Sequence, residues 1–183
     1  MIKYEVDYEL SKEIYDNHND LIEGNQCYKN IFNVYINNIL KDKNVTYCIG
    51  YAIKNDFIYR HGFIRLNDKI IDPTPFTYGN EDEIRNLNYM IIKEFSRDQY
   101  SDLFLTEKTK FYGLEDYLAK DEAKFIEKHN LFEKINVVDI MNLMSYYYGK
   151  SLSKIGGEAY LDLNKKVFSE KKFISIEEFM KGK

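Results

Sequence analysis

The chain of 183 residues contains no tryptophan, only two prolines and only two cysteines. Lysine, asparagine, isoleucine and tyrosine are abundant instead, a bias typical of AT-rich coding sequences that says nothing about function. The two cysteines, Cys27 and Cys48, fall in different predicted elements, which argues against a disulfide framework. We therefore expect reduced thiols.

Long apolar runs and an excess of positive charge are also missing. No uninterrupted apolar segment approaches the roughly 20 residues that cross a bilayer, and none follows the first few residues as a leader would. The formal net charge of −4 gives no electrostatic case for a nucleic-acid partner. We expect a cytoplasmic protein that binds neither membrane nor nucleic acid, and the sequence does not predict its oligomeric state.

The composition is that of an ordinary globular protein. Hydrophobic residues make up 44% of the chain and charged residues 31%, and 183 residues suffice for a proper core. We predict a single α+β domain over residues 1–183. Strands are expected at 2–6, 45–53 and 89–95, and helices at 10–21, 114–128 and 136–148, with a capping box at Ser96 and Gln99.

A hairpin is the most informative local feature. Residues 59–74 consist of two short strands of alternating polarity joined at Asn67-Asp68, a residue pair suited to a tight turn. Counting back from that turn makes His61 and Asp72 diagonal neighbours on one face, within about 7–8 Å at the backbone. An imidazole and a carboxylate can meet at that distance.

A second tight turn is predicted at Asn55-Asp56. It places Gly50 opposite His61 on the preceding strand. Gly50 either leaves space beside the imidazole or is simply tolerated at a bend, and the sequence leaves both interpretations open.

The candidate nucleophile is Cys27. Apolar residues recur at helical spacing from Ile31 to Leu40, and Gly24-Asn25 supplies a break and an N-cap just before the cysteine. Unpaired amides and the positive end of the helix dipole in a first helical turn favour a thiolate over a thiol.

The order of Cys27, then His61-Gly62-Phe63, then Asp72-Pro73-Thr74 resembles the papain-like and transglutaminase-like cysteine enzymes. It is especially similar to their small uncharacterised bacterial and phage-borne members. The resemblance covers residues 20–76. It implies a Cys27, His61 and Asp72 triad, with the cysteine helix packed on an antiparallel sheet and additional C-terminal helices.

Two positions depart from that family pattern. Phe63 stands where tryptophan is commoner, and Leu21 lies near the place where papain-like enzymes carry an oxyanion-hole glutamine. The backbone N–H of Cys27 and the side chain of Asn25 or Gln26 are therefore the candidate oxyanion donors.

The implied function is a thiol-dependent hydrolase that cleaves a peptide or amide bond in a peptide or protein substrate without a cofactor. Cys27 would attack the carbonyl carbon, His61 would move the proton, and Asp72 would orient His61. Residues 1–76 would form the catalytic core, and residues 77–183 would add helices and strands to the same domain.

Three alternatives stay open. The same triad serves an acyltransferase of transglutaminase type, and the fold could instead belong to a non-catalytic, phage-borne protein that binds a host protein. The predicted register also places Cys48, His61 and Asp72 on one sheet face, where with Cys27 they could bind zinc. We do not predict a metal site.

Overall fold

The computed structural model describes residues 2–54, 57–106, 125–126, 128–129 and 131. The chain divides into two compact units, residues 1–114 and 115–183. All the secondary-structure elements described below lie in the first unit. The helices predicted over 114–128 and 136–148 fall outside the described residues, apart from positions 125, 126 and 128. Over the described residues, no helix combines the length and the apolar character needed to cross a membrane.

The first unit alternates helices and strands. In chain order it comprises β1 (Tyr4–Val6), α1 (Tyr8–His18), the 3₁₀ turn η1 (Asn19–Leu21), α2 (Cys27–Ile36), β2 (Val45–Lys54), β3 (Phe57–Leu66), β4 (Lys69–Ile71), the 3₁₀ turn η2 (Thr74–Thr77), α3 (Glu81–Arg85), β5 (Asn88–Phe95) and α4 (Arg97–Thr106). The mixed helix and strand content confirms the α+β prediction.

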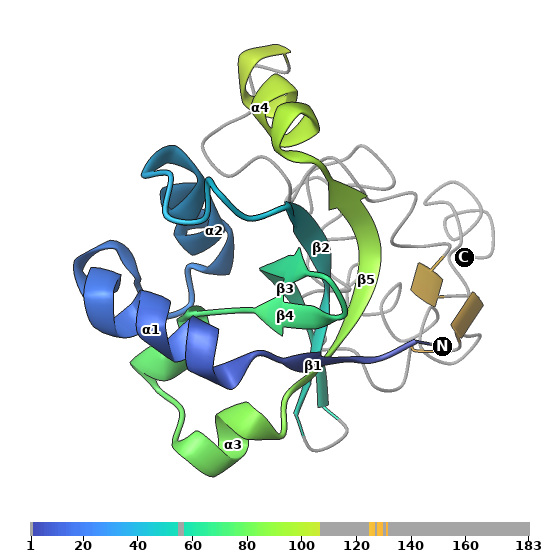
Figure 1. Ribbon diagram of the computed structural model, residues 1–183. Coiled ribbons are helices and arrows are strands. Elements are labelled where there is room, and N and C mark those ends of the chain that lie inside the picture. Colours follow the sequence, from blue (N-terminus) through green and yellow to red (C-terminus); the bar gives the residue numbers. More distant parts are fainter. Residues whose placement is uncertain (1, 55–56, 107–124, 127, 130, 132–183) are drawn as a thin grey trace, which may run out of the picture. The chain divides into compact units, whose positions relative to one another are not determined.

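The strands close into a small barrel in the order β1-β4-β3-β2-β5 (Figure 1). Strand β1 closes it, because it pairs in parallel with β4 and antiparallel with β5. The predicted antiparallel pairing is therefore confirmed for the other pairs, and the parallel pairing of β1 with β4 is the exception. The sequence could not predict this parallel pair, because β1 has only three residues and its partners β4 and β5 lie far from it in the sequence.

Both predicted hairpin registers are confirmed. Strand β3 pairs Ile64 with Ile71, and on its other side it pairs His61 with Gly50. Of the two turn residues, Asn67 takes a left-handed φ of 56°. Asparagine tolerates that conformation better than most residues, so the turn fixes the register of β3 and β4.

Gly50 is needed for contact with β5, not for space beside His61. A Cβ atom built at Gly50 would lie 1.8 Å from the carbonyl oxygen of Met90, and the pairing of β2 with β5 shifts register between Ile49 and Gly50. The β5 backbone thus approaches β2 too closely for any side chain at this position.

Helix α2 packs on β3 at a second glycine. A Cβ atom at Gly62 would lie 2.7 Å from Cδ1 of Tyr28 and 3.2 Å from Cδ1 of Ile31. Because Tyr28 follows Cys27 and Gly62 follows His61, this close contact brings the first residue of the helix to the histidine. In Figure 1, α1 and α2 lie on the same side of the strands.

The two ends of α2 differ from the prediction. Asn25 does not cap the helix: it takes a left-handed φ of 59°, and Gln26 is the N-cap residue, without a side-chain capping bond. The sequence predicts that the helix ends near residues 41–44, but it ends at Ile36, because Asn38 adopts a left-handed φ of 56° that breaks the helix.

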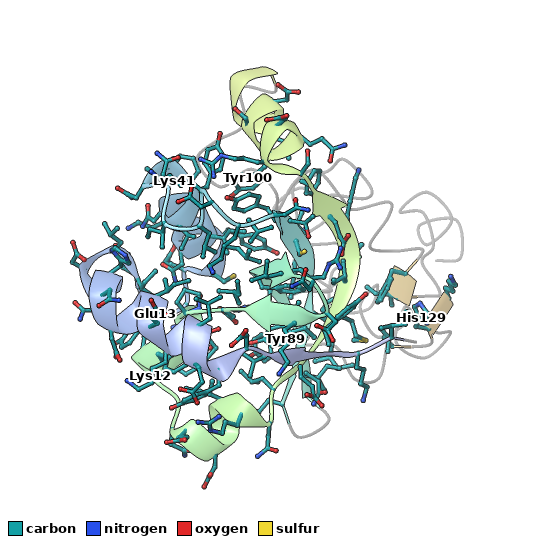
Figure 2. All side chains as sticks on the ribbon, viewed as in Figure 1. Lys12, Glu13, Lys41, Tyr89, Tyr100 and His129 are labelled. Atoms are coloured by element: carbon teal, nitrogen blue, oxygen red, sulfur yellow. The ribbon has the colours of Figure 1, made fainter. Side chains whose placement is uncertain are left out.

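Helix α4 begins at the predicted capping box. The Ser96 backbone N–H donates to Gln99 Oε1 at 2.9 Å, and the Gln99 N–H donates to Ser96 Oγ at 3.2 Å. Tyr100, labelled in Figure 2, extends from α4 and stacks on Tyr47 of β2 with a ring separation of 4.4 Å. This stack holds α4 against the barrel.

Candidate active site

The Asp72 carboxylate accepts three hydrogen bonds in the site. It is fully buried, and its Oδ2 accepts hydrogen bonds from His61 Nε2 at 2.7 Å and from the Tyr89 hydroxyl at 2.9 Å. Its Oδ1 accepts the Thr74 backbone N–H at 3.0 Å, and its own backbone N–H donates to Ser11 Oγ at 3.0 Å. Asp72 therefore both orients the histidine and fixes the turn into η2.

Tyr89 comes from β5 and is labelled in Figure 2, where it lies among the strands of the barrel. Burial, followed by the neighbouring Asp72 carboxylate, raises the pKa of Tyr89 well above 10. Tyr89 thus remains a hydroxyl donor to Asp72 at any pH at which the protein would work.

His61 is enclosed by rings. The Tyr59 ring meets it edge-on at a centroid distance of 5.6 Å, and the Phe63 ring lies 6.4 Å away. Only 3% of the residue is exposed. Burial lowers the pKa of His61, but the Asp72 carboxylate and Cys27 together raise it well above 6.5.

Cys27 opens helix α2 and remains partly exposed. Its thiol lies close enough to His61 to contribute to the raised pKa of the histidine. Since Nε2 of that ring is bonded to Asp72, Nδ1 is the nitrogen left for the thiol. A part-exposed thiol, a buried imidazole and a buried carboxylate thus stand in series.

Asn30 fixes the approach to Cys27. Its fully buried side chain accepts the Glu23 backbone N–H at 2.9 Å and donates to the Glu23 carbonyl oxygen at 2.8 Å. The same Nδ2 donates to Thr74 Oγ1 at 3.1 Å. One side chain therefore ties the loop before Cys27 to the turn that follows Asp72.

Cys48 lies in a different environment. Burial, first of all, raises the pKa of its thiol to about 12, and the side chain belongs to the apolar core together with Phe63 and Ile70. Within the described part of the chain, no three histidine, cysteine or acidic side chains are grouped so that they could hold a metal ion. The zinc alternative has no support from this arrangement.

The candidate oxyanion donors Asn25 and Gln26 are both exposed, in the loop that enters α2. Sequence reasoning did not find Ser11, Tyr59 or Tyr89. A signal existed for Tyr59, which the predicted register places two residues before His61 on the same face. No such signal existed for Ser11 or Tyr89. Ser11 meets Asp72 only because α1 packs on the barrel, and Tyr89 meets it only because the barrel closes.

Comparison with protein-family models, with curated proteins and with solved structures found no match to this chain.

Proposed function

We propose that the chain is a cysteine hydrolase that cleaves a peptide or amide bond, as the resemblance to papain-like and transglutaminase-like enzymes suggested. One observation carries the proposal. Buried Asp72 holds His61 by Nε2 at 2.7 Å, and the histidine lies near the thiol that opens α2. This is the connectivity of a nucleophile, a base and an orienting acid.

In the first half-reaction, the Cys27 thiol has passed its proton to His61, and the resulting thiolate attacks the carbonyl carbon of the substrate. The tetrahedral intermediate collapses when the C–N bond breaks, and His61 returns the proton to the leaving amine. Cys27 is left as a thioester with the acyl group.

In the second half-reaction, water attacks the thioester carbonyl and His61 accepts its proton. The C–S bond breaks, the product leaves as a carboxylic acid, and the protonated histidine restores the thiol. Asp72 stabilises the imidazolium in both halves, and Tyr89 fixes the Asp72 oxygen that faces the ring.

The experiment that tests this function is the capture of the acyl-enzyme. We expect the folded protein, mixed with an activated peptide ester and quenched within seconds, to gain the mass of one acyl group, mapped by peptide sequencing to Cys27. Cys48 serves as the internal control, because its buried thiol should stay unmodified.

Water and an added primary amine should then compete for the adduct. Release mainly as the free acid supports hydrolysis, whereas capture mainly by the amine would assign acyl transfer instead. If the protein forms no adduct with any of a set of esters, thioesters and peptides, that result would contradict the enzymatic proposal and favour a binding protein.

A further inference from the structure

Two donors share one oxygen of the Asp72 carboxylate. His61 Nε2 lies 2.7 Å from Asp72 Oδ2, and the Tyr89 hydroxyl donates to the same Oδ2 at 2.9 Å. Asp72 and Tyr89 are fully buried, and His61 is only 3% exposed. Because bulk water does not screen these bonds, a change in one of them alters the strength of the other.

Segments that are distant in the sequence hold Tyr89 in this place. Its backbone pairs with Ala52 on β2, and its ring lies edge-on to the Phe63 ring at a centroid distance of 5.0 Å. The His61 ring is 6.3 Å away. Since close packing fixes the ring of Tyr89, its hydroxyl stays directed at the carboxylate while the histidine gains and loses its proton.

The second donor acts differently on the two protonation states of His61. When the histidine is cationic, the imidazolium itself balances the negative charge of Asp72. When the histidine is neutral, that buried charge depends on hydrogen-bond donors such as the Tyr89 hydroxyl. The hydroxyl therefore stabilises the state with a neutral histidine more than the state with a cationic one, which lowers the proton affinity of His61.

Titratable groups from several elements interact electrostatically with this pair: Cys27 of α2, Tyr59 of β3, Tyr78 after η2 and Tyr89 of β5. Burial is the largest cause that raises the pKa of each of the three tyrosines, so all three stay uncharged where a thiol enzyme works. Helix α1 contributes the uncharged Ser11 hydroxyl, which accepts the Asp72 backbone N–H. Among these groups of the described chain, Cys27 is thus the one whose charge changes together with that of His61.

We propose that Tyr89 is a positioning residue that acts on the reaction through Asp72: by sharing Oδ2, its hydroxyl weakens the hold of the carboxylate on the His61 proton. The inference rests on the proposed cysteine-hydrolase function. The weaker hold matters when the tetrahedral intermediate collapses, because His61 must then return its proton to the nitrogen of the leaving amine as the C–N bond breaks.

Tyr89→Phe removes the hydroxyl and keeps the ring against Phe63. The test follows His61 directly, by NMR titration of the imidazole nitrogens in the full chain, with the signal assigned by its loss in His61→Gln. We expect His61 to titrate about one pH unit higher in Tyr89→Phe than in the wild-type protein. Turnover at neutral pH should fall by roughly 10-fold, because a proton that is held more tightly is returned more slowly.

A second variant tests the same bond with the opposite sign. Replacing Tyr89 with 3-fluorotyrosine keeps the hydroxyl and makes it more acidic, so it becomes a stronger donor to Asp72. We expect His61 to titrate at lower pH in this protein than in the wild type. This measurement remains decisive if Tyr89→Phe does not fold.

Tyr47→Phe is the matched control. It removes the hydroxyl of another fully buried tyrosine, whose partner is Arg97 Nη1 at 3.4 Å. The His61 titration should stay at the wild-type position there, even if the protein melts earlier. An unchanged His61 titration in both Tyr89 variants, or the same shift in the Tyr47 control, would overturn the inference.

Failure of the inference and failure of the proposed function give different results. If Cys27 forms the acyl-enzyme but the His61 titration does not respond to either change at Tyr89, the inference is wrong and the hydrolase function stands. If the wild-type protein never forms the acyl-enzyme, the proposed function fails, and the inference fails with it.

Discussion

Cys27→Ala is expected to abolish turnover of any ester or peptide substrate that the wild-type protein cleaves. The loss should approach about 10⁶-fold, the effect of removing the nucleophile from a serine protease with a comparable triad. The fold should persist, because Cys27 is partly exposed at the first position of α2 and the helix is held by Tyr28 and Ile31 against Gly62.

Cys48→Ala is the matched control for that experiment, since it removes the other thiol of the chain. Its turnover per folded molecule should stay near the wild-type value, although the vacated space in the core lowers the free energy of unfolding. Activity that survives in Cys27→Ala but is lost in Cys48→Ala would reverse the assignment of the nucleophile.

Asp72→Asn is expected to lower turnover by about 10⁴-fold, as the same replacement does in other triads. The asparagine can keep its Oδ1 bond to the Thr74 N–H and so preserve the turn. Its Nδ2, however, donates to His61 Nε2, where the carboxylate accepted. The neutral histidine then carries its proton on Nδ1, the nitrogen that must take the proton from Cys27.

Asp68→Asn is a suitable control, because it makes the same change at the exposed turn of the same hairpin. Turnover and the melting temperature should both be unaffected there. The measurement for both variants is turnover together with thermal unfolding. An Asp72→Asn protein that melts much earlier but retains turnover would show that Asp72 serves only the turn.

Sequence reasoning reached the local parts of this site. Two-residue turns fix strand register, so the pairing of Gly50 with His61 and the approach of Asp72 to that histidine were both predictable. The helix start at Cys27 was predictable for a similar reason, because a break in the pattern precedes it.

The parts that depend on distant segments were not predictable. The sequence left two interpretations of Gly50 open, space beside His61 or tolerance at a bend, whereas the atom that requires a glycine belongs to Met90 on β5. Tyr89 supports Asp72 only because β5 pairs with both β1 and β2 to close the barrel. Strand pairings of this kind are set by packing between distant segments, and the alternation of polar and apolar residues within one strand does not predict them.

The reactivity of Cys27 toward iodoacetamide at pH 6 tests the central claim most directly, because it needs no knowledge of the substrate. The raised pKa of His61 keeps the histidine cationic at pH 6, so it can stabilise a thiolate at Cys27, whereas the pKa of Cys48, about 12, keeps that thiol protonated. We predict that Cys27 of the folded protein is alkylated first and that His61→Gln slows its reaction strongly at pH 6. Alkylation of Cys48 before Cys27, or a Cys27 rate that is the same with and without His61, would contradict the account.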